Sequence, residues 1–330
     1  MKNLRLIIFL LLQVCSSKLL LAQVDAHFSQ YYANPLWLNP ALTGVINGNA
    51  RLTAQYKNQW ASINNAYQTG GLTGDFRADD HIGLGINVLD QSAGSNSYNY
   101  FTGYGSFSYG FAISNDGNHR ISFGLQAGIV NRTFNMNNLQ FGNQFNGVGY
   151  DPSLNNFETF TNTVTTVFDS NAGVFYYDGT PDKSANVFGG VSVGHLNRPK
   201  DPFSNALDAR IPLRYTFHGG VRIKAGYSLD LTPNFLYVQQ QKASIKAAGL
   251  YSEFKIDNDK GLILGALYRV NDAAVANVGF RVNSLIIGTS YDFNTSSLNQ
   301  ATGGRGGLEL SVSYVFLKHL SLPEPICPRL

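Results

Sequence analysis

The sequence of 330 residues is poor in cysteine and in charged residues. Its two cysteines are Cys15 and Cys327, and Cys15 lies in a segment that we expect to be removed. The mature chain can therefore form neither an internal disulfide nor a cysteine metal cluster. Only 14% of the residues are charged, against about 25% in an ordinary soluble protein. A formal net charge of +3, without a Lys/Arg cluster, gives no support to nucleic acid as a partner.

Residues 1–22 have the pattern of a secretory signal peptide. Lys2 and Arg5 provide the positive start, and residues 6–12 provide the apolar core. A lipoprotein signal with Cys15 as the lipidated residue is the alternative, but the small residues expected before such a cysteine are missing. The sequence therefore predicts cleavage of this segment and export across the inner membrane.

After the signal, no stretch approaches the roughly 18 consecutive apolar residues that a membrane-spanning helix requires. Glycine is abundant instead, with 34 residues, and aromatic residues make up 13% of the chain. Only helices and closed β-barrels satisfy every backbone hydrogen bond in hydrocarbon. A mature chain that is apolar enough for lipid and lacks spanning helices is therefore expected to form a closed barrel.

Apolar and polar residues alternate with a period of two, as expected of a barrel wall with a lipid face and a lumen face. Tyr215 and Phe217, for example, alternate with Arg214, Thr216 and His218. We count about fourteen such segments, which begin near Gly48, Ala66, His81, Ser97, His119, Ser170, Ser184, Ile211, Ser228, Lys242, Lys260, Ala273, Ser284 and Gly306. The prediction is an all-β, transmembrane, antiparallel outer-membrane β-barrel over residues 48–319. A soluble β-sandwich or propeller also alternates, and periodicity alone leaves it open.

The lengths of the connections support this count. Three long connections are predicted, at residues 133–169, 197–210 and 294–305, and all three lie at one end of the barrel if the N-terminus is periplasmic. Outer-membrane barrels keep periplasmic turns short and let extracellular loops grow. The end with the long connections is therefore predicted to face outward.

Two segments lie outside the predicted wall. Residues 23–47 contain the pairs Asn34-Pro35 and Asn39-Pro40, which we expect to exclude regular helix and strand pairing. This irregular N-terminal segment is predicted to pack inside the barrel as a luminal plug or against a periplasmic partner. Residues 320–330 contain three prolines and are predicted to form a short periplasmic C-terminal tail, either a solvated stub or a docking peptide.

Several short motifs occur in order along the chain. They are Phe28-Ser29-Gln30-Tyr31, Asn34-Pro35-Leu36, Leu38-Asn39-Pro40-Ala41 with Gly44, Tyr56-Lys57-Asn58-Gln59-Trp60, Ser290-Tyr291-Asp292-Phe293-Asn294, Gly307-Leu308-Glu309-Leu310-Ser311 and Cys327-Pro328-Arg329. Together they resemble the PorP/SprF family of Bacteroidota, outer-membrane proteins of the type IX secretion system and gliding machinery. Two positions depart from the pattern, since Leu330 replaces an expected aromatic residue and Lys57 an arginine.

The resemblance implies an outer-membrane barrel that binds protein partners for secretion and surface anchoring. The partner is either a secreted adhesin-type protein, bound by its C-terminal signal domain, or a periplasmic component of the secretion core. The candidate partner or plug motif consists of Phe28, Ser29, Gln30, Tyr31, Asn34, Pro35, Asn39, Pro40, Ala41 and Gly44, and the candidate docking tail of Cys327, Pro328, Arg329 and Leu330. A second hypothesis is a FadL-like transporter of hydrophobic small molecules, because such barrels carry a plug segment similar to Asn39-Pro40-Ala41.

No pattern of catalytic residues stands out. The six histidines are scattered, without an H-x-x-x-H pair. The glycine-rich run at residues 303–307 leads into a predicted strand and not into a helix, so a phosphate site is not expected. The acidic residues in predicted turns lack the ligand series of a calcium loop. The sequence therefore predicts a protein that is not an enzyme and that carries neither cofactor nor metal.

Overall fold

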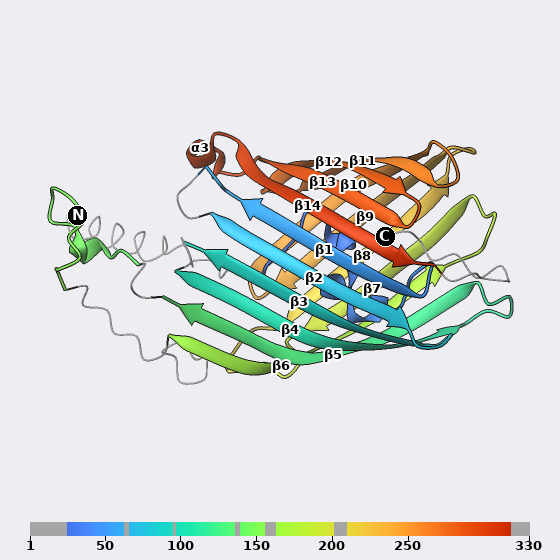
Figure 1. The fold of residues 1–330 in the computed structure, drawn as a ribbon, viewed down its shortest axis with the longest axis horizontal. Helices are drawn as coiled ribbons and strands as arrows, with labels where there is room; N and C mark the ends of the chain where they lie inside the picture. Colours follow the sequence, from blue (N-terminus) through green and yellow to red (C-terminus); the bar gives the residue numbers. More distant parts are fainter. Residues whose placement is uncertain are drawn as a thin grey trace, which may run out of the picture.

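A computed structural model describes residues 25–62, 66–94, 97–135, 139–155, 163–200 and 210–317. These residues form one closed barrel of fourteen antiparallel strands, in which each strand pairs with its neighbours in sequence and β1 closes against β14 (Figure 1). The strands are β1 (Ala50–Gln59), β2 (Tyr67–Arg77), β3 (Ile82–Ala93), β4 (Tyr98–Ala112), β5 (His119–Phe134), β6 (Val164–Asp178), β7 (Ala185–Gly194), β8 (Arg214–Lys224), β9 (Leu229–Gln240), β10 (Ala243–Lys255), β11 (Lys260–Arg269), β12 (Ala273–Val282), β13 (Leu285–Asn294) and β14 (Arg305–Phe316). Among the described residues, no helix has the length and apolar character needed to span a membrane.

The predicted barrel with about fourteen strands is confirmed, and most strands begin within two residues of the expected position. The largest error concerns β6, which begins at Val164 and not near Ser170. Its first residues continue the ladder with β5 as far as the pair Thr133 and Val164. A smaller error concerns β8, which begins at Arg214 and not near Ile211.

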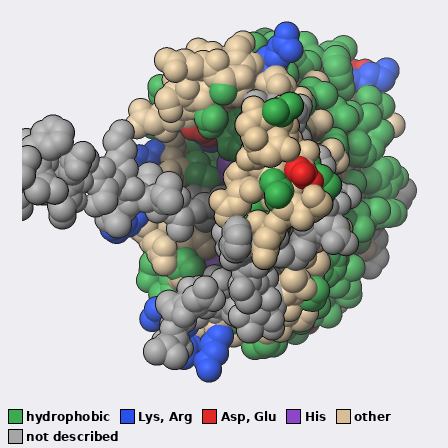
Figure 2. Space-filling model, turned by 90° about the vertical axis from the view of Figure 1, so that its left-hand side faces the viewer, with side chains coloured by type: hydrophobic (Ala, Val, Ile, Leu, Met, Phe, Trp, Pro, Cys, Tyr) green, Lys and Arg blue, Asp and Glu red, His purple; other side chains and the backbone are tan. Residues whose placement is uncertain are grey.

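Side chains alternate between two environments along each strand, as the period-two pattern predicts. In β5, Ser122 and Gln126 face the lumen and are buried, whereas Phe123 and Leu125 face outward and are 46% and 60% exposed. Similar exposed apolar side chains recur around the wall at Leu52, Leu72, Phe76, Ile86, Phe107, Phe217, Phe235, Leu250, Phe280, Leu308 and Val312. This surface forms the lipid-facing belt of the barrel, part of which is visible in Figure 2.

The two ends of the barrel differ in the length of their connections. Residues 135–163, 195–213 and 295–304 connect strands at one end, which we call the loop end. The first of these connections contains η4 (Gly142–Gln144) and the last contains α3 (Asn299–Thr302). At the opposite turn end the connections are short, such as residues 225–228 and 283–284. By the asymmetry of outer-membrane barrels, the loop end faces outward and the turn end faces the periplasm.

Residues 25–49 lie inside the barrel and form what we call the plug (Figure 1, dark blue). The plug contains three short helical turns, η1 (Tyr31–Ala33), α2 (Pro35–Leu38) and η2 (Pro40–Leu42). It runs from the loop end, where Asp25 contacts Gln240, to the turn end, where it joins β1.

The expectation that the two Asn-Pro pairs exclude helix was wrong for α2 and η2. Pro35 and Pro40 occupy the first helical position, where no backbone N–H donor is required. The side chains of Asn34 and Asn39 cap the two turns by accepting hydrogen bonds from backbone N–H groups two or three residues later. The Asn-Pro pair therefore starts a short helix in this segment.

The asymmetry of the two ends predicts a labelling pattern on intact cells. A cysteine in place of Val148, which is 98% exposed at the loop end, is expected to react with a membrane-impermeant maleimide. A cysteine in place of Asn258, exposed in a turn at the opposite end, is expected to react only after the cells are opened. Both variants carry Cys327→Ser, so that only the new thiol is measured. Labelling of Asn258→Cys on intact cells would show that the barrel has the opposite orientation.

Candidate functional site: the plug and its anchors

The plug is fastened by a group of buried charged side chains in the half of their strands nearer the loop end. Ser29 Oγ donates to the carboxylate of Asp292 on β13, with O–O distances of 2.7 and 2.8 Å. The backbone N–H groups of Ser29 and Gln30 donate to the two oxygens of Glu309 on β14, at 2.7 and 2.8 Å. The plug backbone thus satisfies a carboxylate that would otherwise be buried without enough donors.

Two cations from other strands complete this group. Lys57 Nζ on β1 lies 3.3 Å from Asp292 Oδ2 and 3.0 Å from Ser29 Oγ. Arg269 on β11 donates to Asp292 Oδ2 at 2.8 Å and to Ser29 Oγ at 2.7 Å. We call these six residues, Ser29, Gln30, Lys57, Arg269, Asp292 and Glu309, the central anchor. Two cations face two carboxylates, which offsets the large cost of removing each charge from water.

The second anchor holds the Asn-Pro-Ala segment closer to the turn end. Asn39 Nδ2 donates to the backbone oxygen of Val174 at 3.1 Å and lies 3.1 Å from His218 Nε2. Ser122 Oγ on β5 donates to the backbone oxygen of Ala41 at 2.7 Å. The His218 ring stacks on Phe175 with centroids 5.7 Å apart. These contacts place the plug directly against the strands on this side of the lumen.

Glycine makes this close approach possible. A Cβ atom on Gly124 would lie 2.2 Å from the backbone nitrogen of Ala41, and one on Gly173 would lie 2.0 Å from Asn39 Oδ1. Gly288 is similar, since a Cβ there would lie 2.4 Å from the Gln30 side-chain oxygen. The plug therefore packs against bare backbone at these positions, which explains part of the high glycine content.

The third group of contacts lies at the loop end and holds the start of the plug. His195, which directly follows β7, lies between two carboxylates, with Nε2 2.8 Å from Asp25 Oδ2 and Nδ1 2.9 Å from Asp169 Oδ2. Arg214 Nη1 lies 3.3 Å from Asp25 Oδ2, and its guanidinium stacks 4.6 Å above the Trp37 ring. We call Asp25, Asp169, His195 and Arg214 the loop-end latch. Figure 2 looks into this end, where histidine side chains are visible in a hollow of the barrel.

Electrostatics keeps His195 charged in this latch. Burial opposes the charged imidazolium, but the attraction of Asp25 and hydrogen bonds to Asp169 and Asp25 raise the pKa of His195 to about 9. Burial likewise opposes the Asp25 carboxylate, yet His195 and Arg214 hold the pKa of Asp25 well below its usual range. The latch is therefore an ion pair at neutral pH, which ties the N-terminal segment to the loop that follows β7.

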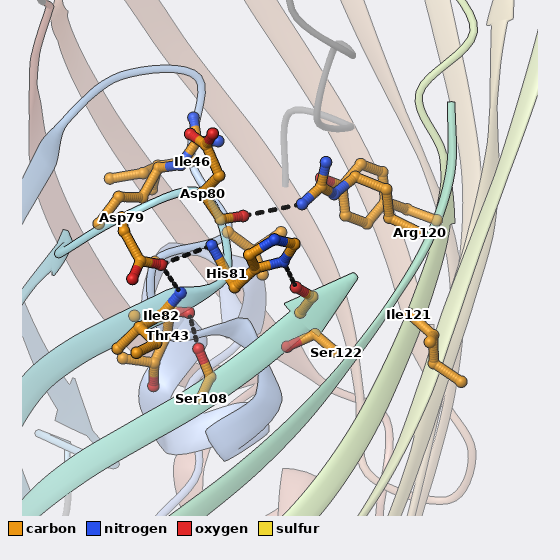
Figure 3. Close-up of a pocket in the computed structure, with 16 residues that line it drawn as sticks. Thr43, Ile46, Asp79, Asp80, His81, Ile82, Ser108, Arg120, Ile121 and Ser122 are labelled. Atoms are coloured by element: carbon orange, nitrogen blue, oxygen red, sulfur yellow. Dashed lines mark hydrogen bonds between the residues drawn. The ribbon is translucent and has the colours of Figure 1, made fainter. Parts of the chain in front are cut away.

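Two hollows lie at the turn end. The smaller one, about 40 Å³, lies between the plug and the turns after β2 and β4 (Figure 3). There Asp79 accepts from the backbone of His81 and Ile82, and Arg120 donates to the backbone of Asp80. These hydrogen bonds close the turns. The larger hollow, about 160 Å³, lies between the plug and strands β8 to β14, and we call it the vestibule.

The structure places all residues of the candidate plug motif inside the lumen, namely Phe28, Ser29, Gln30, Tyr31, Asn34, Pro35, Asn39, Pro40, Ala41 and Gly44. It brings Ser29 and Gln30 together with Lys57, Asp292 and Glu309, which come from other sequence motifs. The candidate tail of Cys327, Pro328, Arg329 and Leu330 lies outside the described residues. Within the described ranges, no group of three or more His, Cys, Asp or Glu side chains could hold a metal ion.

Sequence reasoning missed the loop-end latch and the role of Arg269. The available signal was a charged residue at a lumen-facing position inside or next to an apolar strand, where charge is costly unless paired. Asp169 and Arg269 both satisfy this description. Their partners follow only from the register of the strands.

These features define the class of the protein: it is a plugged, fourteen-stranded β-barrel of the outer membrane. The toluene transporter TbuX of Ralstonia pickettii has a similar fold, with a TM-score of 0.53 and 9% identity over 85% of this chain and 93% of that chain. The toluene transporter TodX of Pseudomonas putida gives a TM-score of 0.51 and 10% identity over 88% and 94% of the two chains. At this identity the likeness concerns the fold alone. No curated protein matches the sequence.

The family model of the type IX secretion system membrane protein PorP/SprF matches residues 20–314. The chain therefore belongs to the PorP/SprF family, as the motifs predicted.

The central anchor predicts that the fold depends strongly on one lysine. Lys57→Met leaves Asp292 and Glu309 without one of their two cations, so the free energy of unfolding is expected to fall by about 3–5 kcal/mol. Urea unfolding in detergent micelles, followed by the electrophoretic shift of folded barrel, measures the change. Lys242→Met, at an exposed position in the turn between β9 and β10, is the matched control. Equal stability of the two variants would contradict the role of the anchor.

The latch predicts a stability that falls as the pH rises. Because the pKa of His195 is about 9 in the folded protein and about 6.5 in the unfolded chain, the latch contributes fully below the lower value and is lost as the pH passes the upper one. As the pH rises from the lower to the upper of these pKa values, the melting temperature of the wild type is expected to fall relative to that of His195→Gln. Thermal unfolding of both proteins over this pH range measures the difference. His81→Gln, at an exposed turn position, should keep the wild-type profile.

Proposed function

We propose that this protein serves type IX secretion as a closed docking barrel, which binds protein partners at its ends and passes none of them through its lumen. The observation that supports this most strongly is the central anchor. Lys57 and Asp292 are 1% and 2% exposed, and both contact the plug. A secreted protein could cross the lumen only if the plug left, and that would remove the hydrogen bonds that Ser29 and Gln30 donate to the buried carboxylates of Asp292 and Glu309.

Its proposed partners differ between the two ends. At the loop end, a secreted adhesin-type protein binds by its C-terminal signal domain, which serves secretion, surface anchoring and gliding motility. The connection between β5 and β6 supports such contact, because Phe145 and Val148 are 53% and 98% exposed at its tip. At the turn end, a periplasmic component of the secretion core binds. Neither role requires catalysis, a cofactor or a metal.

A transporter of hydrophobic small molecules is the second candidate, supported by the fold that the chain shares with toluene transporters. An apolar pocket between the plug and β8 to β10 lies near the loop end, lined by Trp37, Leu38, Leu236, Val238 and Ile245 among others. Its volume of about 40 Å³ is small, since an apolar cavity that binds benzene measures about 150 Å³. The vestibule would be large enough, but the two hollows share no lining residue, so the described residues outline no continuous path for a hydrocarbon from the loop end. This separation favours the docking barrel.

Affinity purification of a tagged chain from mildly solubilised outer membrane, with mass spectrometry, tests the proposal. We expect recovery of a secreted surface protein, of a periplasmic secretion component, or of both. The double variant Phe145→Ser/Val148→Ser is expected to lose the surface protein and keep the periplasmic one. Recovery of the barrel alone, together with toluene flux into proteoliposomes that carry it, would favour the transporter.

A further inference from the structure

The plug fills only one side of the lumen at the turn end. Its segment from Leu36 to Ala41 is hydrogen-bonded to strands β5 and β7, through Gln126, Ser122 and Ser192. On the other side, next to β8 to β14, the vestibule remains open. It adjoins the central anchor, because Gln30 lines it, and the proposed function assigns it no role.

Part of the vestibule lining is apolar and carries three aromatic rings. Tyr32 from the plug, Phe188 from β7 and Tyr251 from β10 line it, together with Ile263 and Ile286. Its volume of about 160 Å³ matches that of an apolar cavity of about 150 Å³ that holds one benzene molecule. The vestibule therefore has the size and lining for a single aromatic ring.

Charged residues surround the entrance. Arg222 and Lys255 share the carboxylate of Asp230, at 2.6 and 2.8 Å, and Arg281 pairs with Glu253 at 2.6 Å. All five residues lie within two positions of a strand end at the turn end. Because two cations share one carboxylate, the Asp230 side of the entrance has an excess positive charge. Such a site favours a carboxylate, which accepts charge-assisted hydrogen bonds from arginine.

We propose that the vestibule binds an extended segment of a periplasmic protein, which inserts one aromatic side chain and sets a neighbouring acidic side chain against Arg222 and Lys255. This inference rests on the proposed function, since it names the chemistry by which the turn end recognises its periplasmic partner. The charged entrance favours an acidic peptide over a hydrocarbon, because only the peptide brings a carboxylate to the excess positive charge beside Asp230. The turn end also faces the compartment from which such a partner comes.

Fluorine NMR with the full-length protein in detergent micelles tests the proposal. The probe is a capped peptide of sequence Ser-Glu-Phe-Ser-Gly whose phenylalanine carries a 4-fluoro group. We expect its signal to broaden on addition of the wild type. Ile286→Trp, which fills the vestibule, is expected to weaken binding by about tenfold or more, as for an interface hot spot. Leu264→Trp is the matched control, because Leu264 lies next to Ile263, is 39% exposed on the lipid face and does not line the vestibule.

A second pair of measurements tests the charge. The peptide with Gln in place of Glu should bind more weakly than the Glu peptide to the wild type, and Arg222→Gln should remove this preference. If Ile286→Trp does not fold, as judged by its electrophoretic shift, Ile263→Phe replaces it as the cavity-filling variant.

Three results would overturn the proposal. They are equal binding by the cavity-filling variant and Leu264→Trp, no binding by the wild type, or binding of free 4-fluorophenylacetate as tight as that of the peptide. The last result would identify a small aromatic acid as the ligand. Co-purification of partners is measured separately. If partners still co-purify while the peptide does not bind, only the vestibule proposal fails and the docking function is retained.

Discussion

The carboxylates of Asp292 and Glu309, buried inside the barrel, are the constraint on which the rest of the structure depends. Neither carboxylate can remain charged in the lumen without cations and hydrogen-bond donors around it. The plug supplies some of these donors to both carboxylates, through Ser29 and Gln30. Lys57 and Glu309 stand directly opposite each other where β1 pairs with β14. The plug is therefore fastened at the seam that closes the barrel, so that plug docking and barrel closure stabilise each other.

A plug held at one seam could still swing within a wide lumen, and glycine prevents this. Where the wall lacks side chains, at Gly124 and Gly173, the Asn-Pro-Ala segment reaches the strand backbone. Together with the central anchor at Ser29 and the latch at Asp25, the plug is then held by three groups of contacts. Glycine thus has two uses here, since it allows tight turns and it makes room for the plug.

Much of the wall could be predicted because lipid and lumen select different side chains at alternate positions. The start of β6 was placed too late, although the β-branched residues Val164, Thr165 and Thr166 favour a strand. Their place in the barrel follows from their pairing with β5, which the sequence does not show directly. The motif residues of the plug were identified, but their partners were not. Arg269 and His195 belong to none of the motifs, and their contacts with the plug depend on strand register.

The two ends of the barrel have different surfaces, and the anchored plug separates them. The loop end presents an exposed apolar tip at Val148, whereas the turn end presents a small aromatic cavity with a charged entrance. Moving the plug to couple these ends would break its hydrogen bonds to Asp292 and Glu309, each worth about 1.5–3 kcal/mol because the acceptor is charged. Partners at the two faces would therefore be joined by a rigid barrel in the membrane. This favours a connector between surface and periplasm over a gate.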